Sequence, residues 1–201
     1  MTINTENYKW PRPIGFQPFN HQKETAEFLS LRRRAFCFNE QGTGKTASVI
    51  WAADYLMAKG AVKRVLILCP LSIMQTSWQN DLFKFAVHRT VDVAYGTPEK
   101  RKKIVSGTAE FIIINYDGVP SVFEELKNGG FDLIVIDEAN AYKNVQTKRW
   151  KMMRRLLGEK TGMWMLTGTP AAQSPVDAYG LAKMCVPHNA PQFYGDFRQA
   201  V

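Results

Sequence analysis

Two short polar segments stand out because each follows an apolar run and combines charged side chains with small ones. In the first, Gly42, Thr43, Gly44, Lys45 and Thr46 lie between a strand-like run and a helical stretch. Glycines there let the backbone curl with its N–H groups inward, and the following helix adds positive charge at its N-terminus. The segment predicts a phosphate-binding loop, with Lys45 on the β- and γ-phosphates and Thr46 on Mg²⁺.

The second segment is an acidic pair, Asp137 and Glu138, which directly follows the apolar run at residues 133–136. Asp137 can hold Mg²⁺, and Glu138 can orient and deprotonate the water that attacks a γ-phosphate. A glycine turn before a lysine and a polar strand end are ordinary features when each stands alone. Their order on one predicted sheet favours a nucleoside triphosphatase site with Lys45, Asp137 and Glu138 as its catalytic groups.

Apolar runs alternate with helical patterns along the chain, and this alternation predicts the fold. Strands are predicted at residues 35–38, 65–69, 91–94, 111–114, 133–136 and 163–166. Helices are predicted at residues 18–31, 46–59, 72–85, 119–127, 145–157 and 175–185, with one more opening at residues 97–98, where Thr97 is the expected cap. The candidate apolar contacts of the first helix are Phe19, Ala26, Phe28 and Leu29. Continuous apolar strands are typical of parallel sheets buried on both faces. We therefore expect an α/β domain at residues 18–201, with a central, mostly parallel sheet between helices, after an irregular N-terminal arm at residues 1–17.

Composition and charge limit the class of protein. The 201 residues suit one sizeable domain, and 26 Lys and Arg against 18 Asp and Glu favour a polyanionic partner such as nucleic acid. Cys37, Cys69 and Cys185 form no paired motif, and the histidines have no metal-ligand spacing. Because Cys37 and Cys69 sit in apolar strand-like runs, they are expected to be buried thiols. The first eight residues are polar and no apolar run approaches about 20 residues, so we expect a cytoplasmic or nucleoid-associated protein that is neither secreted nor membrane-bound.

Three segments, residues 42–46, 137–140 and 166–170, resemble motifs I, II and III of superfamily-two helicases. More narrowly, residues 39–46 (NEQGTGKT) are similar to the DEMGLGKT of Swi/Snf-like DNA-translocating ATPases, which also lacks a leading glycine. The resemblance spans about residues 16–198. It implies the first RecA-like lobe of such a motor, a P-loop NTPase domain that uses ATP and Mg²⁺.

The resemblance also assigns nucleotide-binding residues. Residues 19–22 (FNHQ) resemble the family's adenine-reading segment, which assigns Gln22 to the base, since an amide both donates and accepts hydrogen bonds. The predicted nucleotide-binding set is Gln22, Gln41, Gly42, Thr43, Gly44, Lys45 and Thr46. The predicted Mg²⁺ ligands are Thr46 and Asp137.

A nucleic-acid face follows from the same resemblance. Residues 68–72, with Trp78 beyond them, resemble motif Ia, and residues 114–117 resemble the family's next DNA-contacting strand end. The implied contacts are Pro70, Leu71, Ser72, Asn115, Tyr116, Thr167, Gly168 and Thr169. Hydroxyl and backbone N–H groups of this kind bind phosphates without reading bases. The basic clusters at residues 32–34, 100–103 and 148–155 either add positive field there or form solvated helix faces.

Two features bear on activity. Asn140 stands where the family usually has the histidine of DEAH, which puts the coupling to motif III in question, and residues 171–174 (AAQS) replace a segment like IQNS. After residue 170 only 31 residues remain, with no second set of strands. We expect the second lobe, with its arginine for the γ-phosphate, to be absent from this chain, and the isolated lobe to be a monomer that binds ATP weakly and hydrolyses it poorly.

Alternative functions stay open at this point. An RNA helicase or a restriction-type translocase would share the same motifs, while movement on duplex DNA is the preferred reading. A non-catalytic nucleic-acid-binding module with a relic nucleotide site is a different class, although intact Lys45, Thr46, Asp137 and Glu138 argue against decay. A small-molecule kinase or a GTPase would not need the Thr167-Gly168-Thr169 segment.

Overall fold

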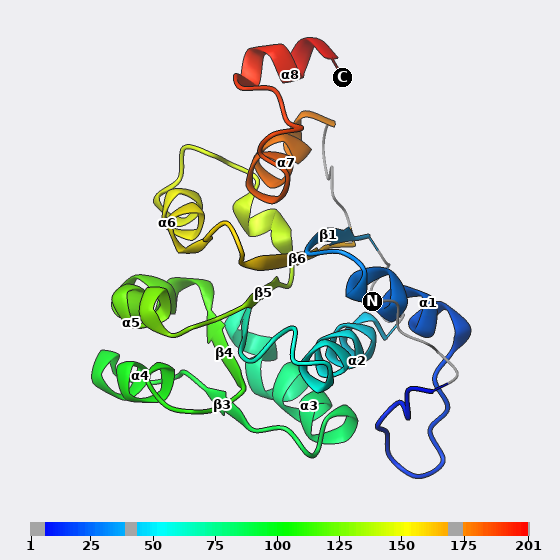
Figure 1. Ribbon diagram of the computed structural model, residues 1–201. Helices are drawn as coiled ribbons and strands as arrows, with labels where there is room; N and C mark the ends of the chain where they lie inside the picture. The colour runs from blue at the N-terminus through cyan, green and yellow to red at the C-terminus, as the bar shows by residue number, and fades with distance from the viewer. Residues whose placement is uncertain (1–6, 39–43, 169–174, 201) are drawn as a thin grey trace.

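A computed structural model describes residues 7–38, 44–168 and 175–200, and Figure 1 shows the chain as a ribbon. Within these residues a sheet of six strands forms the centre. The strands are β1 (Arg34–Cys37), β2 (Val65–Cys69), β3 (Val91–Val93), β4 (Phe111–Asn115), β5 (Leu133–Ile136) and β6 (Gly162–Leu166). Their order is β1-β6-β5-β2-β4-β3, and every pairing is parallel. The predicted parallel α/β architecture is therefore confirmed.

Helices connect the strands. They are α1 (Asn20–Ser30), α2 (Lys45–Ala58), α3 (Asn80–Phe85), α4 (Pro98–Val105), α5 (Phe123–Asn128), α6 (Lys148–Leu156), α7 (Tyr179–Cys185) and α8 (Tyr194–Ala200). Thr97 and Thr147 cap α4 and α6, because each side-chain oxygen accepts a backbone N–H from the first turn. Within the described residues, no helix combines the length and the apolar character needed to span a lipid bilayer.

Alternate residues of each buried strand feed two separate cores. On β2, Val65, Ile67 and Cys69 pack in one cluster with α1, α2 and α3, whereas Leu66 and Leu68 pack in the other with α4 to α7. Figure 1 shows these two groups of helices on opposite faces of the sheet. Both faces of the sheet are therefore covered, which explains why the central strands are continuously apolar. The cysteines at 37, 69 and 185 are buried free thiols, as predicted for the first two.

The predicted helix at residues 72–85 is wrong in detail. The chain there forms a 3₁₀ turn (η1, Leu71–Ile73), then a π-helical segment (η2, Met74–Gln79), and becomes α-helical only at α3. Trp78 in η2 is fully buried and donates its indole N–H to Asp137, so a long-range contact accompanies the departure from α-helix.

Two further expectations need correction. The helix predicted at residues 119–127 begins as a 3₁₀ segment (η3, Tyr116–Val122), because Pro120 lacks the N–H of an α-helix interior. Ala26 and Leu29 of α1 are buried as expected, but Phe28 is 43% exposed, and Phe19, which directly precedes α1, is 61% exposed. Phe28 instead lies under the Arg32 guanidinium, 5.0 Å from its ring centre.

The described part of the N-terminal arm, residues 7–17, contains no helix or strand and packs against α2. The Trp51 indole N–H donates to the carbonyl of Pro11 at 2.7 Å. The Tyr8 hydroxyl donates to Asp54 Oδ2 at 2.6 Å, and Trp10 is buried edge-on against Trp51. The arm thereby covers the far side of the helix that begins at Lys45.

Candidate nucleotide and nucleic-acid site

The end of the predicted phosphate loop stands directly at the start of α2. Gly44 has φ +72°, a left-handed conformation that glycine adopts without cost, and a Cβ atom there would lie 2.1 Å from Gln22 Nε2. Lys45 opens the helix and is only 9% exposed, while Thr46 is half-buried. The loop residues Gln41, Gly42 and Thr43 lie outside the described residues. A glycine is therefore required at position 44 on two independent grounds.

Gln22 contacts the loop rather than standing apart from it. Its Nε2 donates to the carbonyl of Gly44 at 3.3 Å, and its Oε1 accepts the backbone N–H of Phe19 at 3.0 Å. The side chain is buried between α1 and the loop. The glutamine assigned to adenine by resemblance thus also ties the start of α1 to the last residue of the phosphate loop.

The acidic pair follows β5 at the edge of the sheet where the parallel strands end. The Asp137 N–H donates to the carbonyl of Leu68 at 2.8 Å, which extends the β2–β5 ladder by one bond. Its Oδ2 accepts the Trp78 indole N–H at 2.9 Å, and its Oδ1 accepts the Glu138 N–H at 2.9 Å. Two N–H donors therefore fix the orientation of the carboxylate.

Glu138 has φ +50°, one of two positive φ values among the described non-glycine residues. That conformation costs a non-glycine residue about 1–2 kcal/mol. It turns the chain out of β5 into the short 3₁₀ segment η4 (Ala139–Tyr142) and leaves Glu138 half-buried beside Asp137. Residues held in such conformations cluster at functional sites.

Electrostatics link the acidic pair to the loop. Burial raises the pKa of Asp137, which is 6% exposed; the bonds from Trp78 and the Glu138 N–H and the charge of Lys45 partly lower it. The charge of Lys45 therefore acts on Asp137, which lies directly beside Glu138. The catalytic roles of these three residues stay predictions.

The residues predicted to contact nucleic acid separate into two groups. Leu71 is 54% exposed and Ser72 is exposed, and with Tyr95 they line a hollow of about 220 Å³. Pro70 beside them is half-buried. These residues directly follow β2, so they lie on the same edge of the sheet as Asp137.

The remaining predicted contacts are less accessible. Thr167 is fully buried, and its N–H donates to the carbonyl of Cys37 at 3.2 Å. Asn115 is buried and accepts a bond from Arg101 Nη1 at 2.9 Å. Gly168 is half-buried, and Thr169 lies outside the described residues.

Tyr116 has a structural partner that its motif did not indicate. Its hydroxyl donates to the carbonyl of Asp137 and lies 3.4 Å from that of Glu138. Burial, followed by the charge of Asp137, raises the pKa of this phenol, so it stays protonated and keeps donating. Tyr116 therefore joins the end of β4 to the acidic pair.

Two contacts at the candidate site have no local signal in the sequence. The Trp78 bond to Asp137 spans 59 positions, and Arg101 in α4 reaches both the Gly96 carbonyl and Asn115. Trp78 was part of the motif Ia resemblance, but nothing near it indicates which residue its indole contacts. Arg101 lies in a basic cluster that could equally be a solvated helix face.

Comparisons with known proteins agree with this geometry. The chain is 28% identical over 177 residues to the uncharacterized ATP-dependent helicase YqhH of Bacillus subtilis (strain 168), covering 86% of this chain and 30% of that protein. It is 29% identical over 179 residues to the SWI/SNF-related matrix-associated actin-dependent regulator of chromatin subfamily A-like protein 1 of Xenopus laevis, covering 86% of this chain and 17% of that protein.

Among solved structures, the Sulfolobus solfataricus SWI2/SNF2 ATPase core in complex with dsDNA superposes with a TM-score of 0.78 at 27% identity. The match covers 94% of this chain and 40% of that one, so this chain spans less than half the length of each of these relatives. The SNF2-related domain family matches residues 21–201. With the parallel sheet, the buried lysine at the start of α2 and the acidic pair after β5, this match shows that the chain belongs to the SNF2-related domain family.

Proposed function

We propose that this chain is the ATP-binding lobe of a motor that couples ATP hydrolysis to movement along double-stranded DNA. The observation that carries the proposal is the position of two buried charged residues at the edge where the parallel strands end. Lys45 lies at the start of α2 and Asp137 lies after β5, and the charge of Lys45 acts on Asp137. Ligands of open α/β sheets bind at this edge, and perturbed charged groups cluster at functional sites, so a phosphate-binding role accounts for both residues.

The residues present fit a magnesium–ATP complex. Lys45 would hold the terminal phosphates, and Thr46 and Asp137 would hold Mg²⁺, which supplies charge to stabilise the transferring phosphoryl group. Mg²⁺ bound with a nucleotide needs only one or two carboxylates, because phosphates and water fill its other positions. Each Asp137 oxygen accepts a single N–H in the bonds described above and has a second lone pair.

Glu138 is the proposed general base. Its carboxylate would take the proton of the attacking water, and its left-handed backbone sets it beside Asp137 without continuing the strand. Gln22 would hold the adenine, after releasing one of its bonds to Phe19 or Gly44. Base binding would then be communicated to the phosphate loop, because the same amide touches Gly44.

Duplex DNA is the proposed track. The Sulfolobus solfataricus core was solved with dsDNA, and the present chain carries a formal charge of +8. Leu71 and Ser72 offer an exposed surface beside the nucleotide edge for phosphate contact. Because the partner is bound through its backbone, the motor would move without regard to sequence. A DNA-associated location inside the cell follows from this proposal.

Turnover by this lobe alone is proposed to be weak. The chain spans a minor part of the length of its relatives, and an arginine from a second lobe would contribute about 10³- to 10⁵-fold in rate by analogy with other P-loop enzymes. Robust DNA-stimulated hydrolysis by the 201-residue chain would contradict this part of the proposal.

The nucleotide site is tested by Lys45→Ala, with Lys59→Ala at the other end of α2 as the matched control. Titration with a fluorescent ATP analogue should show binding to the parent chain and to Lys59→Ala, and none to Lys45→Ala, while circular dichroism shows all three folded. Unchanged affinity in Lys45→Ala would remove the site assignment.

The nucleic-acid substrate is tested on the longer protein that contains both lobes. Its ATPase rate should rise most with duplex DNA. Greater stimulation by RNA or by single strands would favour an RNA helicase instead, and no hydrolysis with any nucleic acid would favour a binding module with a relic site.

A further inference from the structure

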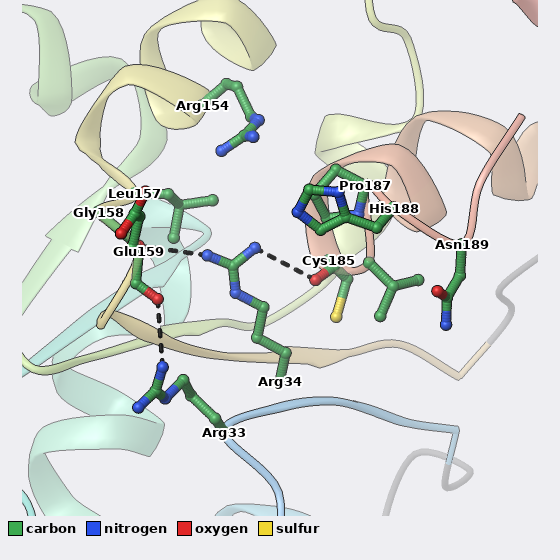
Figure 2. Close-up of a pocket in the computed structure, with 11 residues that line it drawn as sticks. Arg33, Arg34, Arg154, Leu157, Gly158, Glu159, Cys185, Pro187, His188 and Asn189 are labelled. Carbon is green, nitrogen blue, oxygen red and sulfur yellow. Dashed lines mark hydrogen bonds between the residues drawn. The ribbon is translucent and has the colours of Figure 1, made fainter. Parts of the chain in front are cut away.

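Two basic clusters that are far apart in the sequence meet in one pocket. Arg33 and Arg34 come from the start of β1, and Arg154 comes from the last turn of α6. His188, after the end of α7, lines the same pocket of about 650 Å³. Figure 2 shows the Arg34 side chain extending between the ends of α6 and α7, with Arg154 and His188 on either side of it.

This pocket lies on the edge of the sheet opposite the nucleotide site. Arg34 is the first residue of β1, whereas the predicted phosphate loop comes after the last residue of β1, Cys37. Gly158 and Glu159, which also line the pocket, come before the start of β6. Helices α6 and α7 each return from the carboxyl ends of strands, so their last turns also reach this edge. A ligand here would therefore be separate from the one held by Lys45 and Asp137.

Positive charge exceeds negative charge in the pocket, because three arginines line it against one carboxylate, that of Glu159. Among the residues that the structure describes, none of the three arginines makes an ion pair with a carboxylate. Arg34 donates to the backbone carbonyls of Cys185 at 3.4 Å and Gly158 at 3.3 Å, and Arg33 donates to that of Glu159 at 3.3 Å. All three bonds are longer than is usual for N–H···O bonds. Arg34 uses two of its five N–H groups in them and Arg33 uses one, so other N–H groups can bind a ligand.

The two neighbouring arginines act on Arg34 with the same sign. Burial, followed by the charge of Arg154, lowers the pKa of Arg34; Arg33 adds to this effect, and Cys185 opposes it. The adjacent Cys185 thiol supplies no anion at neutral pH, because burial raises its pKa to about 11. Bringing guanidinium groups together in this way costs free energy unless an anion occupies the space between them.

We propose that this pocket is a second anion site that binds a phosphate group through Arg34 and Arg154, with Arg33 and His188 at its rim. Guanidinium groups match phosphate oxygens with paired N–H bonds, which a lysine cluster on a solvated face would not do. A volume of about 650 Å³ exceeds a single phosphate ion, so it suits a phosphate within a larger molecule.

The site is tested by titrating the chain with sodium tripolyphosphate and with inorganic phosphate, using the Lys45→Ala background so that the phosphate loop does not compete. Arginine Nε–Hε signals in ¹H–¹⁵N spectra report on the pocket directly. We expect saturable shifts of Arg34 and Arg154, and an affinity for tripolyphosphate about ten-fold lower in Arg154→Gln.

Arg155→Gln is the matched control, because it removes the same charge from the same helix. Arg155 does not line this pocket; its guanidinium lies 4.9 Å from the centre of the Phe123 ring. Equal weakening by Arg154→Gln and Arg155→Gln would show a diffuse positive field and overturn the proposal, as would the absence of saturable shifts. Arg34→Lys keeps the charge but loses the paired N–H groups, so it should also weaken binding.

A labelled short duplex in the same background identifies the source of the phosphate. If the duplex is the ligand, Arg154→Gln lowers its affinity and reduces the slope of log affinity against log salt by about 1, while Arg155→Gln leaves the affinity unchanged. If duplex affinity is unchanged by Arg154→Gln and tripolyphosphate affinity falls, the ligand is a soluble phosphorylated compound. Either result supports a phosphate site and assigns its source.

Discussion

The bond between Trp78 and Asp137 makes a specific prediction about stability. Trp78 is fully buried and gives its indole N–H to a carboxylate that is itself buried, at 2.9 Å. The substitution Trp78→Phe keeps an aromatic ring in place and removes this donor. It should therefore destabilise the fold by an amount that depends on whether Asp137 carries a charge.

The magnitude can be worked from the two parts of the change. A hydrogen bond to a charged group is worth about 1.5–3 kcal/mol and the lost ring atoms about 1 kcal/mol, so Trp78→Phe should cost roughly 2.5–4 kcal/mol when Asp137 is ionised. When Asp137 is protonated, the hydrogen-bond part falls to about 0.5–1.5 kcal/mol.

The dependence on pH has a definite sign. Because burial raises the pKa of Asp137, its contribution to stability is greatest below the pKa of the unfolded chain, about 3.9, and is lost as pH rises through the folded pKa. Removing the Trp78 donor raises the folded pKa further, so this loss continues to higher pH. The free-energy cost of Trp78→Phe should therefore increase with pH.

Urea unfolding in metal-free buffer between pH 4 and pH 8 measures this cost. Trp164→Phe is the control, because Trp164 is equally buried but donates to a neutral carbonyl, that of Arg32, at 2.9 Å. Its cost should be roughly 1.5–2.5 kcal/mol at every pH. If the cost of Trp78→Phe varies as little with pH as that of Trp164→Phe, the charge of Asp137 does not depend on the Trp78 bond. Magnesium-dependent nucleotide binding should also weaken by about 10- to 100-fold in Trp78→Phe only.

Two more substitutions test the surroundings of α2. Gly44→Ala should lower the free energy of unfolding more than Gly60→Ala does. Both glycines have φ near +70°, so at either position alanine would be strained by about 1–2 kcal/mol. Only at position 44 would the added Cβ also clash with the side chain of Gln22. Urea unfolding measures both costs, and the extra cost of Gly44→Ala should disappear when Gln22→Ala is also present. Equal costs for Gly44→Ala and Gly60→Ala in the parent chain would contradict the contact between Gly44 and Gln22. Tyr8→Phe should cost about 1.5–3 kcal/mol in the same assay, because it removes a 2.6 Å bond to buried Asp54, and a cost near zero would show that the arm is not held there.

Local patterns in the sequence were enough for the elements and the main motifs. The strand at residues 65–69 was predicted with the observed bounds, and Thr97 was predicted to cap α4 as it does. These features depend on residues that are neighbours in the chain, such as a run of apolar side chains or a cap before a proline. The same is true of the placement of Lys45 at a helix start and Asp137 at a strand end.

Where local preference and long-range packing compete, the patterns gave wrong answers. Residues 74–79 have a helical pattern, yet the burial of Trp78 against Asp137 accompanies a π-helical backbone. Phe28 has the spacing of a core residue, but it lies on the exposed side of α1 beneath Arg32. Neither outcome depends on residues close in the sequence.

Periodicity and motif order are local properties, and they are enough to predict a parallel α/β domain with a phosphate loop before α2 and an acidic pair after β5. They do not predict that Lys45 acts on Asp137, that Gln22 touches Gly44, or that Arg34 meets Arg154 across 120 positions. The physical reason is that strand order and helix packing minimise exposed apolar area over the whole chain, and this determines which distant polar groups come together.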